Sequence, residues 1–125
     1  MSRVKIEMEF IFKASPAIIY QFLTAPENLV RWFADGVDIK EDVYIFTWEG
    51  SDEEALLIDD IEEERLKFRW LESEVDEYYE FRMYKSAITR QTILEITDFC
   101  DKGEEQEQID LWTSQISELQ IVCGG

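Results

Sequence analysis

The stretch Lys13–Asp35, KASPAIIYQFLTAPENLVRWFAD, decides the fold, because two short helical patterns follow one another within it. Ser15 stands directly before Pro16, and a serine cap followed by proline in the first turn is typical of a helix N-terminus. Pro26 begins a second helical pattern, since the residue before a proline disfavours the helical conformation. The stretch therefore predicts two short helices, the second ending at Asp35-Gly36.

The segments on either side of these helices have the period of strands. Apolar residues alternate with charged ones over Val4–Phe12, which predicts a strand with one solvated face. Six further strands are expected after Gly36: Val37–Lys40, Val43–Trp48, Glu54–Ile61, Leu66–Leu71, Tyr78–Lys85 and Gln91–Phe99. The connections between them are too short for crossover helices, so an antiparallel meander is predicted.

The period changes again over Glu104–Cys123. Apolar side chains there follow one another at spacings of three and four residues, which predicts a long amphipathic helix; they are Ile109, Trp112, Ile116, Leu119 and Cys123. With 125 residues, 46% of them hydrophobic, the chain can bury one core without disulfides or metals. We expect a single α+β domain over residues 1–125.

The order of Pro16, Thr24, Pro26 and Trp32, together with the order of elements, resembles the START-like, Bet v 1-like (SRPBCC) superfamily. The resemblance is strongest to its Hsp90-ATPase-activator-homologue-like group, a fold found in many bacterial proteins. It implies a helix-grip fold, in which a curved antiparallel sheet of about seven strands surrounds the long C-terminal helix. It also implies that a lipid or another hydrophobic molecule binds between the sheet and that helix.

The charge of the chain limits its partners. Twelve Lys and Arg residues against 29 Asp and Glu residues give a formal net charge of −17, which repels nucleic acids and anionic membranes. A neutral apolar molecule or a basic protein is compatible with this charge. The N-terminus MSRVKIEMEF lacks the apolar run of a signal peptide, so a cytoplasmic location with reduced Cys100 and Cys123 is expected.

The sequence offers little material for catalysis or metal binding. It contains no histidine, no glycine-rich phosphate loop, and no serine or cysteine beside a candidate base. The acidic runs Asp52–Glu54, Asp59-Asp60 and Glu62–Glu64 lack the spacing of a calcium loop, and we interpret them as solvated turns. No cofactor, metal site or catalytic residue is predicted.

The aromatic side chains are the most suggestive candidates. The chain has four Trp, five Tyr and eight Phe residues, and strand alternation puts many of them on one face of the sheet. They either fill a core or line an apolar cavity whose polar atoms orient a ligand. The candidate ligand-binding residues are Trp32, Phe33, Phe46, Trp48, Phe68, Trp70, Tyr79, Phe81, Met83, Trp112 and Ile116.

Three functions follow from these observations. The first is binding of a hydrophobic small molecule or lipid between the sheet and the C-terminal helix. The second is a co-chaperone-like adaptor that contacts a basic protein through its acidic surface. The third is a cyclase-like enzyme that uses Tyr44, Tyr79 or Asp98 as acid or base, although the missing histidine argues against catalysis.

Overall fold

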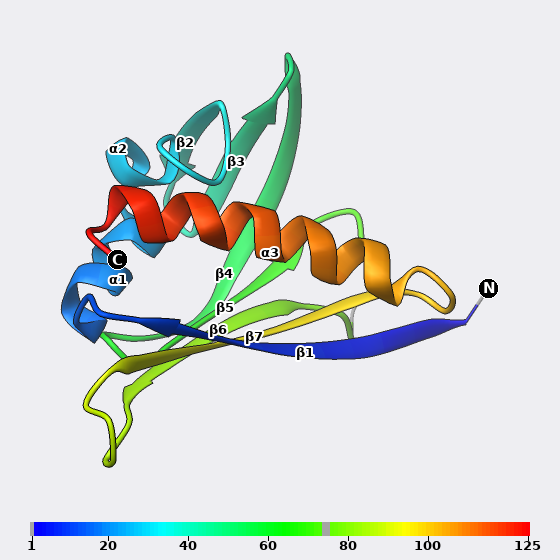
Figure 1. Cartoon of the computed structure of the whole chain (residues 1–125). Coiled ribbons are helices and arrows are strands. Elements are labelled where there is room, and N and C mark those ends of the chain that lie inside the picture. Colours follow the sequence, from blue (N-terminus) through cyan, green and yellow to red (C-terminus); the bar gives the residue numbers. More distant parts are fainter. Residues whose placement is uncertain (1, 74–75) are drawn as a thin grey trace.

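A computed structural model of the chain, which describes residues 2–73 and 76–125, shows the predicted order of elements (Figure 1). The elements are β1 (Arg3–Phe12), α1 (Pro16–Thr24), α2 (Pro26–Leu29), β2 (Gly36–Lys40), β3 (Val43–Trp48), β4 (Ser51–Ile61), β5 (Arg65–Trp70), β6 (Tyr79–Lys85), β7 (Thr92–Asp101) and α3 (Glu105–Val122). Every strand and helix predicted from the sequence is present, most with bounds within one or two residues of the expected ones.

The strands form one seven-stranded antiparallel sheet in the order β1-β7-β6-β5-β4-β3-β2. The sheet is strongly curved, and all three helices lie on its concave side (Figure 1). Helix α3 packs mainly against β1 and β7, whereas α1 contacts β6 and α2 contacts β2. This is the α+β helix-grip architecture that the resemblance implied.

Both short helices begin where the prolines predict, but the expected end of the second at Asp35-Gly36 was wrong. Helix α2 ends at Leu29, because the Leu29 carbonyl accepts the N–H groups of residues 32–34 and the chain continues as turns. The Ser15 hydroxyl accepts a hydrogen bond from the Ile18 backbone N–H at 3.3 Å, and Pro16 occupies the first turn of α1. Ala25 is extended, with φ −81° and ψ 129°, because it precedes Pro26. The backbone therefore turns sharply between α1 and α2.

Strand β4 is longer than predicted and holds two of the acidic runs that we expected in turns. Residues 52–54 and 59–60 lie inside β4, whereas residues 62–64 do form a turn. The register against β5 shifts between Leu57 and Asp59. Beyond this bulge the two adjacent carboxylates point to opposite faces of the strand and have different partners. Asp59 pairs with Arg65 at 2.8 Å, and Asp60 accepts a 2.7 Å hydrogen bond from the Tyr20 hydroxyl. The prediction of turns at these two runs was wrong. An exposed strand can also carry consecutive acidic residues, because their carboxylates stay in water or pair with other side chains.

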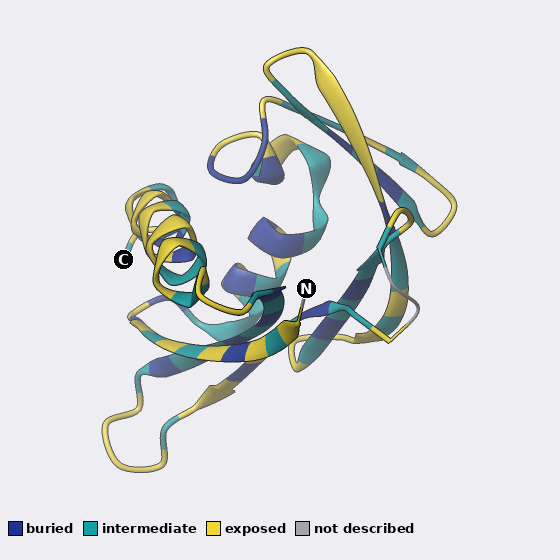
Figure 2. Cartoon of the chain, turned by 90° about the vertical axis from the view of Figure 1, so that its right-hand side faces the viewer, coloured by how far each residue is buried: buried dark blue, intermediate teal, exposed yellow. Residues whose placement is uncertain are grey.

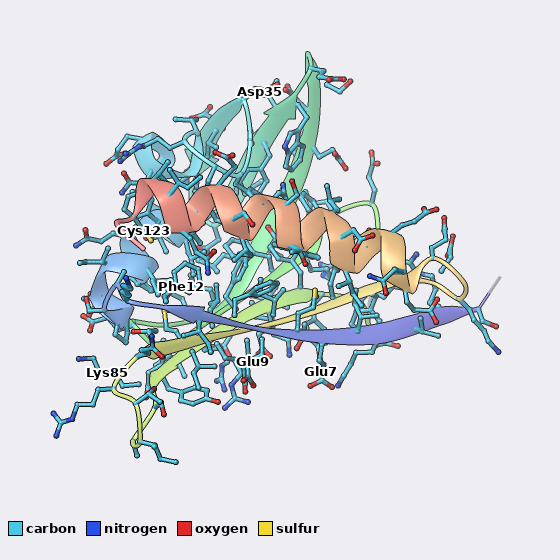
Figure 3. All side chains as sticks on the ribbon, in the orientation of Figure 1. Glu7, Glu9, Phe12, Asp35, Lys85 and Cys123 are labelled. Atoms are coloured by element: carbon cyan, nitrogen blue, oxygen red, sulfur yellow. The ribbon has the colours of Figure 1, made fainter. Side chains whose placement is uncertain are left out.

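The core lies between the concave sheet face and the helices, where buried residues gather in Figure 2. Helix α3 contributes Trp112, Ile116 and Leu119, as its predicted stripe requires. On β1, Glu7 and Glu9 point away from α3 toward the convex side (Figure 3). The convex face is thus the polar face of the sheet.

Within the part of the chain that the structure describes, no helix is long and apolar enough to cross a membrane. Nor do the described residues hold a group of three or more metal-ligating side chains. Cys100 is buried, Cys123 is partly buried, and both are free thiols.

Candidate functional site

An open cleft of about 390 Å³ lies between α3 and the last residues of β3 and β5, on the concave side of the sheet. We call it the aromatic cleft. Its walls come from the loop after α2, from strands β3, β4, β5 and β7, and from one side of α3. The lining residues are Phe33, Trp48, Glu53, Trp70, Asp98, Gln108, Leu111, Trp112 and Gln115.

Phe33 stands at the inner end of the aromatic cleft. Its ring lies 5.4 Å from that of Trp48 and 6.1 Å from that of Trp112, measured between centroids. Its backbone carbonyl accepts the indole N–H of Trp48 at 2.7 Å and the amide of Gln115 at 3.4 Å. The loop after α2 is therefore tied both to the sheet and to α3, and it fixes the Trp48 ring.

Asp98 is the buried carboxylate of the site, with a relative exposure of 9%. One oxygen accepts the indole N–H of Trp112 at 2.8 Å and the amide of Gln108 at 2.9 Å. The other oxygen accepts the backbone N–H of Phe99 at 2.8 Å. Burial raises the pKa of Asp98, and these three hydrogen bonds oppose the rise because they favour the ionised form. Asp98 thereby holds the Trp112 ring in place.

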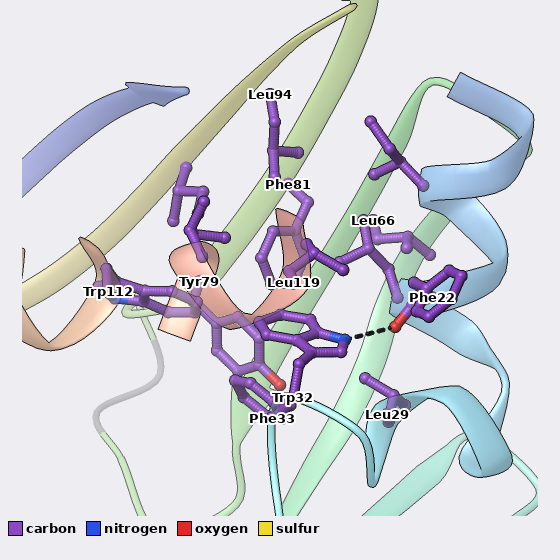
Figure 4. Close-up of a cluster of buried hydrophobic side chains, with 14 of the residues drawn as sticks. Phe22, Leu29, Trp32, Phe33, Leu66, Tyr79, Phe81, Leu94, Trp112 and Leu119 are labelled. Carbon is purple, nitrogen blue, oxygen red and sulfur yellow. Dashed lines mark hydrogen bonds between the residues drawn. The ribbon is translucent and has the colours of Figure 1, made fainter. Parts of the chain in front are cut away.

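Tyr79 lies deeper than the aromatic cleft. Its ring lies near Phe33 in the buried cluster (Figure 4). Both residues line a small interior space that has no room for a water molecule. Among the described residues, the Tyr79 hydroxyl finds no hydrogen-bond partner. Burial, and secondarily the charge of Asp98, raises the pKa of Tyr79 well above its ordinary value, so the hydroxyl is neutral. The pKa of Tyr44 is raised in the same way, by burial and then by Asp60.

A second hollow, of about 290 Å³, continues from the aromatic cleft toward the start of α3. We call it the acidic trough. It shares Trp70, Asp98 and Gln108 with the aromatic cleft, and its acidic lining residues are Asp98, Glu77, Asp101, Glu104 and Glu107. Arg3 also lines it, and its guanidinium already pairs with Glu77 at 2.7 Å and Asp101 at 3.0 Å.

The structure divides the predicted ligand-binding residues into three groups. Phe33, Trp48, Trp70 and Trp112 line the aromatic cleft. Five lie deeper and enclose the small interior space, together with Phe33 itself: Trp32, Phe46, Phe68, Tyr79 and Phe81. Met83 and Ile116 are buried in the core and line neither space. Core filling and cavity lining thus both occur, and only the residues near the mouth are left partly open.

Most of the non-aromatic residues of the aromatic cleft were not predicted from the sequence, although Asp98 was considered as an acid or base. Gln108, Leu111 and Gln115 flank Trp112 on the helix at offsets of minus four, minus one and plus three, so helical spacing could have identified them. Glu53 pairs with Phe46 across β3 and β4, and it shares the concave face with that ring. Only the strand register reveals this position.

Solved structures similar to this chain share its fold. BfR322 from Bacteroides fragilis is 32% identical, the match covers 98% of this chain and 93% of that chain, and the TM-score is 0.69. The Aha1 dimer from Colwellia psychrerythraea is 17% identical, with coverages of 94% and 93% and a TM-score of 0.78. DynU16, from the dynemicin biosynthetic locus, is 16% identical, with coverages of 93% and 45% and a TM-score of 0.78. The last two show the fold alone.

The sequence matches the family model of the START-like superfamily domain over residues 1–125. Among curated proteins, none matches it. Domains of this superfamily often bind hydrophobic ligands. The family match, the helix-grip architecture and the 32% identical relative agree. The chain belongs to the START-like superfamily.

Proposed function

We propose that this protein binds a hydrophobic small molecule in the aromatic cleft. The observation that carries the proposal is a half-open space of about 390 Å³ whose walls are mainly the rings of Phe33, Trp48, Trp70 and Trp112. Ligand sites in proteins commonly measure about 300 to 1,000 Å³ and combine apolar walls with a few polar groups. The aromatic cleft fits this description in size and in composition.

Along β3 and β5, the aromatic rings become more exposed toward the aromatic cleft. Phe46 and Phe68 are each 1% exposed, whereas Trp48 and Trp70, two residues further along, are only partly buried. Leu111, on the facing side of α3, is 53% exposed. An apolar surface left open between polar rims is typical of a binding site, because a bound molecule would remove it from water.

The same geometry favours binding over catalysis. The neutral hydroxyl of Tyr79 does not line the aromatic cleft, and the oxygens of Asp98 already accept three hydrogen bonds. A general acid or base must be within reach of the substrate. Asp98 therefore orients the walls of the cleft in this proposal and transfers no proton.

Native mass spectrometry of the protein purified from its own cells tests the proposal. We expect a bound small molecule that Leu111→Arg removes, because the long charged side chain would occupy the wall of the aromatic cleft. Ile121→Arg is the matched control, since Ile121 is 72% exposed on the same helix and does not line the cleft. A ligand-free protein, or equal retention in both variants, would contradict the proposal.

A further inference from the structure

The polar atoms of the aromatic cleft indicate the charge of its ligand. Building on the proposed function, we infer that this ligand is an organic cation, an aromatic or alkyl ammonium compound, held by the tryptophan rings and by the carboxylate of Glu53. Four independent features of the cleft support this: its hydrogen-bond donors, Glu53, its rings and the adjoining acidic trough.

The first feature is that two of the three indole N–H donors of the cleft are already used. The indole N–H groups of Trp48 and Trp112 donate to the Phe33 carbonyl and to Asp98. The amide nitrogens of Gln108 and Gln115 donate to the same two acceptors. These four side chains leave ring surface, the amide oxygens and one N–H of each glutamine amide for a ligand, and no hydrogen bond among the described residues uses the indole N–H of Trp70. The amide oxygens, together with the carboxylate of Glu53, are acceptors that suit a ligand which donates hydrogen bonds or carries positive charge.

The second feature is the position of Glu53. Its pairing with Phe46 puts it on the concave, aromatic face of the sheet, whereas the adjacent Glu54 pairs with Ile45 and faces the other side. Glu53 lines the aromatic cleft and, among the hydrogen bonds and ion pairs of the described residues, makes none with its side chain. A carboxylate beside Trp48 and Trp70 would repel an anionic ligand and attract a cation.

The third feature is the ring arrangement. The centroids of Trp48 and Trp70 lie 6.1 Å apart at an interplanar angle of 59°, and Phe33 and Trp112 close the inner side. A cation within about 6 Å of an aromatic centroid is attracted by the negative ring face, most strongly by tryptophan. Several rings directed toward one space are the usual way in which proteins recognise quaternary ammonium groups.

The fourth feature is the electrostatic field around the aromatic cleft. Of the described residues that line it, none is Lys or Arg. The acidic trough adjoins it through Trp70, Asp98 and Gln108, and the Arg3 guanidinium within the trough is neutralised by Glu77 and Asp101. Clefts lined by one sign of charge concentrate ligands of the opposite sign. A fatty acid or another carboxylate would find no cation in the cleft to pair with.

The test uses benzyltrimethylammonium, its neutral isostere neopentylbenzene, and the anion 3-phenylpropionate. Binding is followed through the indole N–H signals in ¹H–¹⁵N NMR, where Trp32 serves as an internal control because its indole N–H bonds to the Phe22 carbonyl within the core. We expect shifts of Trp48, Trp70 and Trp112, and a dissociation constant about tenfold lower for the cation than for the isostere. The anion should not bind.

Glu53→Gln and Glu54→Gln form a matched pair, because both remove one negative charge from neighbouring positions on opposite faces of β4. We expect the first to weaken binding of the cation about threefold, with little change for the isostere, and the second to leave both unchanged. Isostere binding as tight as that of the cation would overturn the inference and leave the proposed function standing. Absence of cation binding, or equal effects of the two variants, would overturn the inference as well. The native mass measurement decides the proposed function separately.

Discussion

Truncation of Trp112 to alanine should destabilise the fold strongly, because its ring joins α3 to the concave face of the sheet. Trp112 is 5% exposed, and its ring lies 5.7 Å from that of Phe81 and 6.2 Å from that of Tyr79. Replacing a core tryptophan by alanine costs about 3 to 5 kcal/mol, and the lower half applies because one side of the ring borders the aromatic cleft. Loss of the hydrogen bond to the Asp98 carboxylate adds about 1 to 2 kcal/mol. The expected total is about 4 to 6 kcal/mol of unfolding free energy.

Urea unfolding followed by far-ultraviolet circular dichroism measures this loss without relying on the altered tryptophan. Trp112→Phe keeps one six-membered ring and removes the pyrrole part with its N–H, so it should lose about 2 kcal/mol and should still fold. Ile121→Ala is the control on the exposed side of α3 and should change stability by less than about 0.5 kcal/mol. A loss below about 1 kcal/mol for Trp112→Ala, or a Trp112→Phe variant as stable as the parent, would show that the helix face is misassigned.

Three further predictions concern local contacts. Ser15→Ala should cost about 1 kcal/mol in urea unfolding, because the cap of α1 is lost; an unchanged midpoint would refute that role. Thr92→Val should cost about 1 kcal/mol, since the buried Thr92 hydroxyl donates to the Ala14 carbonyl at 2.6 Å, and a gain in stability would contradict this. Titration of the Asp98 carboxyl by ¹³C NMR should give a pKa above the ordinary value of about 3.9, because burial disfavours the charged form. The contribution of Asp98 to stability then falls as the pH rises from the unfolded-state pKa to the folded-state pKa; a titration midpoint at or below the ordinary value would be inconsistent with this.

The sequence predicts the elements well because local rules and burial agree in this chain. Ser15-Pro16 and Ala25-Pro26 fix helix ends by backbone chemistry alone, and tertiary contacts do not override them. The alternation in β1 and the three-and-four spacing in α3 follow from one buried side per element. The superfamily follows from the same residues, and the family match confirms it.

The aromatic cleft could be predicted only in part. Strand alternation identified Trp48 and Trp70 as inward-facing, but it could not show that these two are less buried than Phe46 and Phe68. That difference is set by tertiary packing, since α3 lies mainly against β1 and β7 and not against the strands that carry Trp48 and Trp70. The adaptor and cyclase-like alternatives stay predictions.

The position of Glu53 depends on pairings between β3, β4 and β5 that single-strand patterns do not contain. Glu53 lies on the concave face only because Ala55 is opposite both Tyr44 and Trp70. The bulge after Leu57 then changes the register for the rest of the strand. A run of acidic residues with no apolar alternation gives no sign of this from the sequence.

The pairing of β4 with β5 makes the first half of β4 far less tolerant of length variation than the turn between β6 and β7. Deleting one residue between Ala55 and Leu57 would bring Glu54 opposite Trp70 in place of the fully buried Ala55, inverting the facing of the first half of the strand. The turn at residues 86–90 carries the 92% exposed Ile88 and has no such constraint. Relatives of this chain that differ in length should therefore gain and lose residues at that turn, and keep β4 at constant length.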